Sequence, residues 1–188
     1  EISCSLVGSE MCIRDRSYAK NLSAYKREDG YLEGESCIVS WCLGHLAEYA
    51  QPEEYDPKYE KWQFDDLPIL PEAWKLKVSK DKKKQFEVIK TLMNRSDVEY
   101  LVNGCDAGRE GELIFQRVYV LAGCRKPVKR LWISSMEDAA IQKGFQTMKS
   151  EEEYKNLCMA AVCRAQADWL IGMNGTRAYT TRYFKRLV

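Results

Sequence analysis

The sequence lacks the spacings by which cysteine and histidine bind zinc. Its eight cysteines never form a Cys-x-x-Cys pair, and the single histidine, His45, has no partner at zinc-ligand spacing. We therefore expect no zinc in this segment. The cysteines suit reduced core thiols, and with no clean secretory signal they favour a cytoplasmic protein.

An excess of either charge is also missing. The 29 basic and 28 acidic side chains give a formal net charge of +1, so any nucleic-acid surface must be local. Lysines and arginines cluster at 75–84, 125–130 and 177–186, although such runs are usually only solvated faces. No apolar run reaches transmembrane length, so we expect no membrane partner.

The segment 106–112 (DAGREGE) is the most informative part of the chain. It follows a short apolar, β-prone stretch at 99–105 and precedes apolar residues at helical spacing, which predicts a strand, a turn and a helix. Its carboxylates would lie at the carboxyl edge of a sheet, and Mg²⁺ prefers oxygen ligands of this kind, completed by water and phosphate.

Two glycines and one arginine accompany these acids. Gly108 and Gly111 would let the backbone approach closely, while Arg109 would either clamp a substrate phosphate or brace a neighbouring carboxylate. On charge alone an acidic helix start explains the run equally well. The glycine pair and the preceding buried strand favour a functional site.

Strand and helix patterns alternate along the chain. We predict strands at 37–41, 75–78 and 130–133, a helix at 82–92, and a capping box at 135–138 that opens a helix through Met148. This alternation favours an α/β fold with a mainly parallel sheet. Residues 55–71 predict an ordered loop, because five apolar side chains there need packing partners: Trp62, Phe64, Leu67, Ile69 and Leu70.

A second capping box at 150–153 predicts a long helix that ends near Asn174. Arg164, Asp168 and Gly172 share one face of this helix. The spacing alone favours a surface ion pair beside a packing glycine.

Five segments together resemble type IA DNA topoisomerases, and they are most similar to bacterial topoisomerase III, including forms carried on mobile elements. These segments are 38–46 (IVSWCLGHL), 67–71 (LPILP), 106–115 (DAGREGELIF), 130–135 (RLWISS) and 167–174 (ADWLIGMN). They occur in order between about Ala19 and Arg177. The resemblance implies a Toprim domain over 17–148, with a mainly parallel sheet flanked by helices. It also implies that a helical DNA-binding domain begins over 149–188.

In that family a tyrosine attacks a DNA phosphodiester and forms a 5′ phosphotyrosine link, another strand passes, and the break is resealed with Mg²⁺ and without ATP. The resemblance implies that Asp106 and Glu110 are catalytic acids serving Mg²⁺, Glu112 is a supporting metal acid, and Arg109 is a phosphate or carboxylate partner. Its partners would be single-stranded DNA and the remainder of the topoisomerase chain.

The same resemblance implies a DNA-facing group of side chains. Arg164, Asp168 and Arg177 would lie beside the DNA groove. His45, in a Gly-His-Leu segment after a strand, could approach the cleavage site or simply bond a backbone carbonyl in a turn. The expected location is the bacterial cytoplasm, in association with the nucleoid or a mobile element.

Three departures limit what the resemblance carries over. Many family members have a second aspartate where this chain has Gly108, which predicts weaker Mg²⁺ binding. The tyrosine-proline-arginine-threonine segment that holds the nucleophile does not occur, so we expect the isolated chain to be inactive. Residues 3–16 resemble translated sequencing adaptor, and we expect residues 1–16 to be non-native. The first strand is then either missing or mimicked by segment 4–10, and counting back without gaps puts Glu10 on the missing catalytic glutamate.

Two other functions remain open from the sequence. The chain could belong to another Toprim protein, a primase or a nuclease, because these also hold Mg²⁺ with clustered acids. It could also be a DNA- or Mg²⁺-binding module without turnover.

Overall fold

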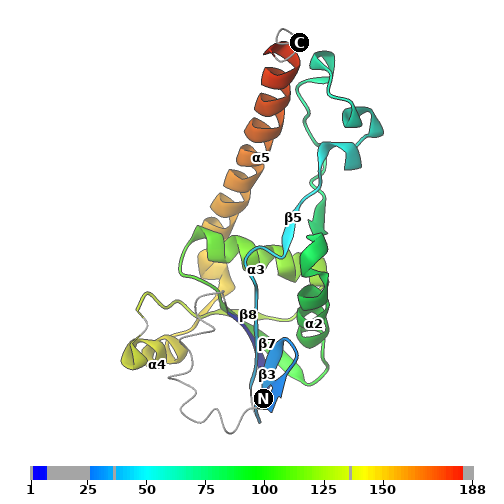
Figure 1. Ribbon diagram of the computed structural model, residues 1–188. Helices are drawn as coiled ribbons and strands as arrows, with labels where there is room; N and C mark the ends of the chain where they lie inside the picture. Colours follow the sequence, from blue (N-terminus) through cyan, green and yellow to red (C-terminus); the bar gives the residue numbers. More distant parts are fainter. Residues whose placement is uncertain (1, 8–25, 36, 136, 184–188) are drawn as a thin grey trace.

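A seven-stranded sheet forms the centre of the protein. The computed structural model describes residues 2–7, 26–35, 37–135 and 137–183, and within them the strand order is β2-β3-β4-β1-β7-β8-β9 (Figure 1). The four central strands run parallel to one another: β4 (Cys37–Trp41), β1 (Ile2–Val7), β7 (Val98–Gly104) and β8 (Val128–Arg130). The edge strands β2 (Lys26–Glu28), β3 (Tyr31–Glu33) and β9 (Lys149–Ser150) pair antiparallel. The predicted α/β fold is therefore confirmed, with antiparallel edges that the sequence pattern did not predict.

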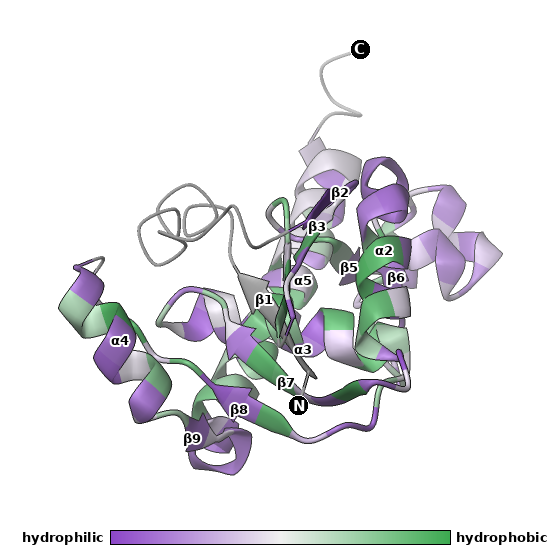
Figure 2. Cartoon of the chain, turned by 90° about the horizontal axis from the view of Figure 1, so that it is seen from below, coloured by the Kyte–Doolittle hydropathy of each residue, from purple (hydrophilic) through white to green (hydrophobic). Residues whose placement is uncertain are grey.

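Helices cover both faces of this sheet because β7 is apolar on both sides. On one face Leu101 packs in a cluster with buried residues of α2 (Lys83–Met93) and α3 (Arg109–Ala122). On the other face Val102 packs with Ile141 of α4 (Asp138–Gln146). Figure 2 shows α4 on the opposite side of β7 and β8 from α2. A strand buried on both faces is apolar at consecutive positions, as Tyr100, Leu101 and Val102 are.

The strand expected at 130–133 lies earlier in the chain. β8 pairs with β7 only through Val128 to Arg130, and the chain then leaves the sheet toward α4. Leu131 and Ile133 are buried against α4 without belonging to a strand. Their apolar pattern indicated burial correctly and strand structure wrongly.

Residues 47–78, here called the arm, rise from the sheet together with the long C-terminal helix α5 (Lys155–Tyr183), as Figure 1 shows. The arm begins and ends in a separate two-stranded sheet of β5 (Ala47–Tyr49) and β6 (Leu76–Val78). Three short 3₁₀ helices lie between these strands: η2 (Pro52–Glu54), η3 (Pro57–Glu60) and η4 (Phe64–Asp66). The arm is thus ordered, as its aromatic and proline content predicted.

The packing expected inside the arm is only partly present. Ile69 is buried against Trp169 of α5, and Leu67 is partly buried in the same cluster. Trp62, Phe64 and Leu70 instead keep 46%, 53% and 64% of their surface exposed. For these three side chains the packing prediction is wrong, because the arm meets a single helix and not a closed core.

The start and end of α5 also differ from expectation. Ser150 caps a 3₁₀ turn, η6 (Glu151–Tyr154), by accepting a hydrogen bond from the Glu152 amide. Glu153, expected in a capping box, pairs with Lys149 at 2.7 Å instead. The helix continues past Asn174 to Tyr183. Over the described ranges, neither α5 nor any other helix is long and apolar enough to cross a membrane.

The amino-terminal predictions fall mostly on residues that the structure does not describe. Leu6 and Val7 lie in β1, between β4 and β7, where counting back placed a strand. Glu10 lies outside the described residues. The non-native origin expected for 1–16, and the domain boundaries at 17–148 and 149–188, stay predictions.

Candidate magnesium and DNA site

The acidic segment lies where β7 ends and α3 begins. The strand ends at Gly104 and the helix starts at Arg109, so Asp106 occupies the turn at the carboxyl edge of the parallel strands. Asp106, Arg109 and Glu110 are exposed. The structure therefore presents two of the three predicted metal acids on one surface, together with the predicted phosphate partner.

The two glycines of this segment serve different needs. A methyl group at Gly111 would overlap the carbonyl oxygen of Asp106 and lie 2.8 Å from its nitrogen, so the predicted close approach is confirmed there. Gly108 would meet no atom within 4 Å, and its φ of 164° is extended backbone open to any residue. Within the protein, therefore, nothing requires glycine at position 108, and its close approach to a metal or phosphate stays a prediction.

Glu112 is separated from the other acids by burial. Its side chain is 1% exposed and pairs with the fully buried Arg130, with 2.5 Å between Oε1 and Nε. The Asn103 side-chain amide donates to its other oxygen at 3.4 Å. This carboxylate is not open to an ion from solvent, so the geometry favours a bracing role. The ligand role predicted for Glu112 stays a prediction.

Arg130 is a residue at this edge that sequence reasoning did not single out. Arg109, expected to be either a phosphate clamp or a brace, is exposed. Arg130 instead hydrogen-bonds four backbone carbonyls around the acidic turn: Asn103, Cys105, Asp106 and Leu131. The one available signal was that Arg130 shares a strand face with the apolar Val128, two residues before it. The charge pattern indicated only that Arg130 belongs to the basic cluster at 125–130.

His45 lies beside the exposed acids. Its Nε2 is 3.5 Å from Oε2 of Glu110, and it follows Gly44, whose φ of 68° makes the turn after β4. Burial, together with the nearby Arg117, lowers the pKa of His45, and the attraction of Glu110 only partly opposes this. The lowered pKa favours the neutral imidazole at neutral pH. His45 lies beside the acids, and its approach to the cleavage site stays a prediction.

The cysteine beside the acidic turn is inert. Cys105 is buried, and both its hydrogen bond with Cys42 and its burial raise the pKa of the Cys105 thiol well above the usual value. Cys42, Cys105 and Cys124 are buried in the core, whereas Cys163 is exposed.

The carboxylates at this edge fit a Mg²⁺ site that is completed by water and substrate phosphate. Across residues 2–7, 26–35, 37–135 and 137–183, no three His, Cys, Asp or Glu side chains are placed to hold a metal ion together. Mg²⁺, however, is usually bound by one or two carboxylates, with waters and substrate phosphate as the remaining ligands. Asp106 and Glu110 suit that kind of site.

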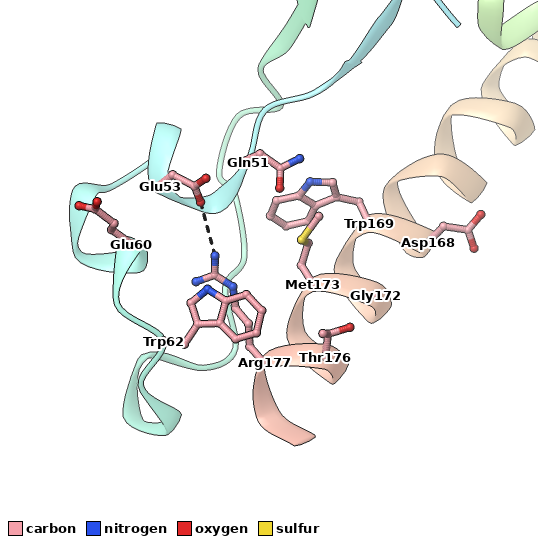
Figure 3. Close-up of a pocket in the computed structure, with 10 residues that line it drawn as sticks. All are labelled: Gln51, Glu53, Glu60, Trp62, Asp168, Trp169, Gly172, Met173, Thr176 and Arg177. Atoms are coloured by element: carbon pink, nitrogen blue, oxygen red, sulfur yellow. Dashed lines mark hydrogen bonds and ion pairs between the residues drawn. The ribbon is translucent and has the colours of Figure 1, made fainter. Parts of the chain in front are cut away.

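A second candidate site lies between the arm and α5. A cavity of about 450 Å³ opens there, and Figure 3 shows the side chains around it: Gln51, Glu53, Glu60, Trp62, Asp168, Trp169, Gly172, Met173, Thr176 and Arg177. Two of the predicted DNA-binding residues, Asp168 and Arg177, therefore line one cavity. Arg164 pairs with Asp168 at 3.7 Å on the helix surface, as the spacing favoured. Gly172 has no atom within 4 Å of an added methyl, so it is not a packing glycine.

Arg177 is turned into the protein. It is 5% exposed, donates to the carbonyl of Tyr59 at 2.6 Å, lies 3.5 Å from Glu53 and stacks over the Trp62 ring at 5.0 Å (Figure 3). Its Nε has no partner among the described residues. The guanidinium thus holds the arm against α5, and its predicted contact with DNA stays a prediction.

Two further side chains of α5 hold the arm. Asn174 both accepts from the amide of Ile69 at 2.6 Å and donates to its carbonyl at 3.0 Å. Trp169 donates its indole N–H to the carbonyl of Ala50 at 3.1 Å. These contacts fix the cavity wall, because buried backbone groups of the arm find their partners on the helix.

Comparison with known proteins agrees with this architecture. The Toprim domain family matches residues 16–136. The chain is 49% identical over 172 residues to DNA topoisomerase 3 of Bacillus subtilis strain 168, covering 92% of this chain and 24% of that protein. It is 47% identical over 186 residues to DNA topoisomerase 3 of a Bacillus cereus strain, covering 99% and 26%. The chain spans about a quarter of the length of these relatives.

A solved structure also aligns with the chain. Full-length topoisomerase I from Thermotoga maritima superposes with a TM-score of 0.47 and 18% identity, covering 81% of this chain and 22% of that one. The family assignment rests on the sequence matches. Because the Toprim match covers most of the chain, the chain belongs to the Toprim domain family.

Proposed function

We propose that the chain is the Toprim part of a type IA DNA topoisomerase of the topoisomerase III kind. The whole enzyme would break, pass and rejoin single DNA strands through a 5′ phosphotyrosine link, with Mg²⁺ and without ATP. The observation that supports this most directly is the exposure of Asp106 and Glu110 at the carboxyl edge of the parallel strands. The names of the relatives agree with it.

The exposed residues at this edge have separate tasks in the proposal. Asp106 and Glu110 would hold Mg²⁺, which when bound neutralises charge on the reacting phosphate. Arg109 is exposed beside them and can hold a phosphate oxygen through its planar fork. His45, as a neutral imidazole 3.5 Å from Glu110, can orient that carboxylate without adding a positive charge.

Strand cleavage would need a nucleophile from elsewhere. The sequence has no tyrosine-proline-arginine-threonine segment. Tyr179 and Tyr183 are exposed on α5 with ring centroids 5.0 Å apart, but neither matches that motif. We therefore expect residues 1–188 alone to bind DNA and metal without cutting, as a non-catalytic module would.

Single-stranded DNA is the proposed partner of α5 and the arm. Trp62 lines the cavity and keeps 46% of its surface exposed, and Arg164 pairs on the α5 surface with Asp168, which lines the same cavity. Aromatic side chains stack on bases of any sequence, and arginines contact phosphates. We place this activity in the bacterial cytoplasm, where chromosomal and mobile-element DNA lies.

Magnesium should stabilise the wild-type chain through Asp106. A ligand that binds only the folded state raises its melting temperature, so added Mg²⁺ should raise the melting temperature of the wild type, and Asp106→Asn should abolish the rise. Gly108→Asp should increase it, because nothing lies within 4 Å of that position and a third carboxylate fits. Scanning calorimetry with and without Mg²⁺ measures the effect.

The matched control for this experiment is Asp168→Asn, which removes an exposed carboxylate from α5. It should leave the Mg²⁺ effect unchanged. If Mg²⁺ does not raise the melting temperature of the wild type, Asp106 and Glu110 do not form a metal site in this chain.

Binding of single-stranded DNA should be weak and sensitive to salt. Each phosphate contact contributes about −0.7 to the slope of log K against log salt for single strands, so Arg164→Ala should make the slope shallower by about that amount. Trp62→Ala should weaken binding without changing the slope, because stacking releases no counterions. Titration of a fluorescent oligonucleotide at several salt concentrations measures both.

The control is Lys84→Ala on α2, whose exposed ammonium pairs with Asp29 at 2.6 Å. It should change neither affinity nor slope. Equal binding at low and high salt would contradict the phosphate contacts. In the full-length gene, a downstream primase or ATPase module would favour another Toprim enzyme over a topoisomerase.

A further inference from the structure

We propose that Arg130, held by Glu112, is a positioning residue for the magnesium-binding acids. It would fix Asp106 through the main chain and would not touch the ion. The inference rests on the proposed function, in which Asp106 and Glu110 hold Mg²⁺.

The position of Arg130 in the sheet explains how it reaches the acidic turn. Arg130 and Asn103 are the last pair of the ladder between β8 and β7. Beyond this pair, the carbonyls of Cys105 and Asp106 receive hydrogen bonds from the Arg130 guanidinium, at 2.6 and 2.8 Å. The Arg130 side chain therefore supplies hydrogen bonds to the backbone that follows β7, beyond the point where β8 ends. It fixes the backbone that carries the Asp106 carboxylate.

The same guanidinium ties this backbone to α3. Its Nε donates to Glu112 at 2.5 Å, and Glu112 lies in the first turn of α3 with Glu110. Gly111, between these two acids, packs against the main chain of Asp106. One buried ion pair thus connects the turn that holds the first exposed acid with the helix that holds the second.

This connection matters because Mg²⁺ requires nearly ideal octahedral geometry. Two carboxylates from a turn and a helix can meet that requirement only if their separation is fixed. Outer contacts that orient metal ligands commonly change metal affinity by about tenfold to a hundredfold. Arg130 is 0% exposed and Glu112 1% exposed, so any effect on the metal must pass through the groups that they hold.

The decisive experiment separates positioning from folding. In Glu112→Leu/Arg130→Met both charges are replaced by apolar side chains, a change that commonly preserves stability when a buried ion pair is removed. Urea denaturation would compare its stability with that of the wild type, and Mn²⁺ paramagnetic resonance would give the metal dissociation constant. We expect the double variant to fold with a somewhat lower unfolding midpoint, because the carbonyls of Cys105 and Asp106 lose their donor, and its dissociation constant to rise about tenfold or more. Wild-type affinity in a folded double variant would overturn the proposal.

Two single variants keep the test sound if the double variant does not fold. Arg130→Lys retains the charge and loses the planar fork that spans several carbonyls, so it should also weaken metal binding about tenfold. Glu112→Gln can still accept from Arg130 and should keep affinity within a few-fold of the wild type. If Glu112→Gln loses as much affinity as Asp106→Asn, Glu112 is a ligand and the positioning role is wrong. Failure of the proposed metal site is a different result, since the wild type itself would then not bind Mn²⁺.

Discussion

Arg130→Met should lower the free energy of unfolding by about 3–5 kcal/mol, the usual cost of leaving one partner of a buried ion pair without the other. Glu112 would remain 1% exposed with no cation beside it, and the carbonyls of Cys105 and Asp106 would lose their donor. Because domains are stable by only about 5–15 kcal/mol, the variant should be partly unfolded at physiological temperature. Urea denaturation followed by circular dichroism measures the loss.

The matched control is Arg164→Met, which removes an arginine from an ion pair of the same kind at the surface. Arg164 and Asp168 are 3.7 Å apart with side chains 54% and 71% exposed. Exposed helix pairs contribute about 0.5 kcal/mol or less, so this variant should be nearly as stable as the wild type. If both variants lost the same free energy of unfolding, burial would not explain how much the Arg130 pair contributes to stability.

Gly111→Ala should destabilise the protein by about 1–3 kcal/mol or more, the range for overpacked sites. Alanine inside a helix normally stabilises by about 1 kcal/mol relative to glycine, so the expected effect has the opposite sign. The reason is the overlap of the new methyl group with the Asp106 carbonyl oxygen, which is backbone and cannot rotate away. The turn would have to move, so the Mg²⁺-dependent rise in melting temperature should also disappear.

Two other glycines serve as controls for this substitution. Gly175 lies within α5 with no atom within 4 Å of an added methyl, so Gly175→Ala should stabilise by about 1 kcal/mol. Gly108→Ala should be neutral or slightly stabilising, since its position is open and its backbone extended. Thermal denaturation of the three variants decides the matter, and a stabilising Gly111→Ala would contradict the close packing at the acidic turn.

Much of the fold could be read from local patterns. The apolar run before Asp106 and the helical spacing after Gly111 predicted β7, the turn and α3, because the periodicity of a strand or helix is written in neighbouring residues. The same patterns gave α2 and β4. The end of α5 and the extent of β8 were missed, since those limits depend on what the elements pack against and not on their own residues.

Within the site, the sequence alone determined that Asp106 and Glu110 stand at the carboxyl edge of a buried strand beside Arg109. It placed Arg164 and Asp168 on one helix face for the same reason, namely that their spacing fixes their geometry. Only the tertiary structure decided that Glu112 pairs with Arg130, that Arg177 holds the arm, and that Trp62 stays exposed. Each of these depends on residues brought together from distant parts of the chain, and which of two similar charges becomes buried is set by the packing around it.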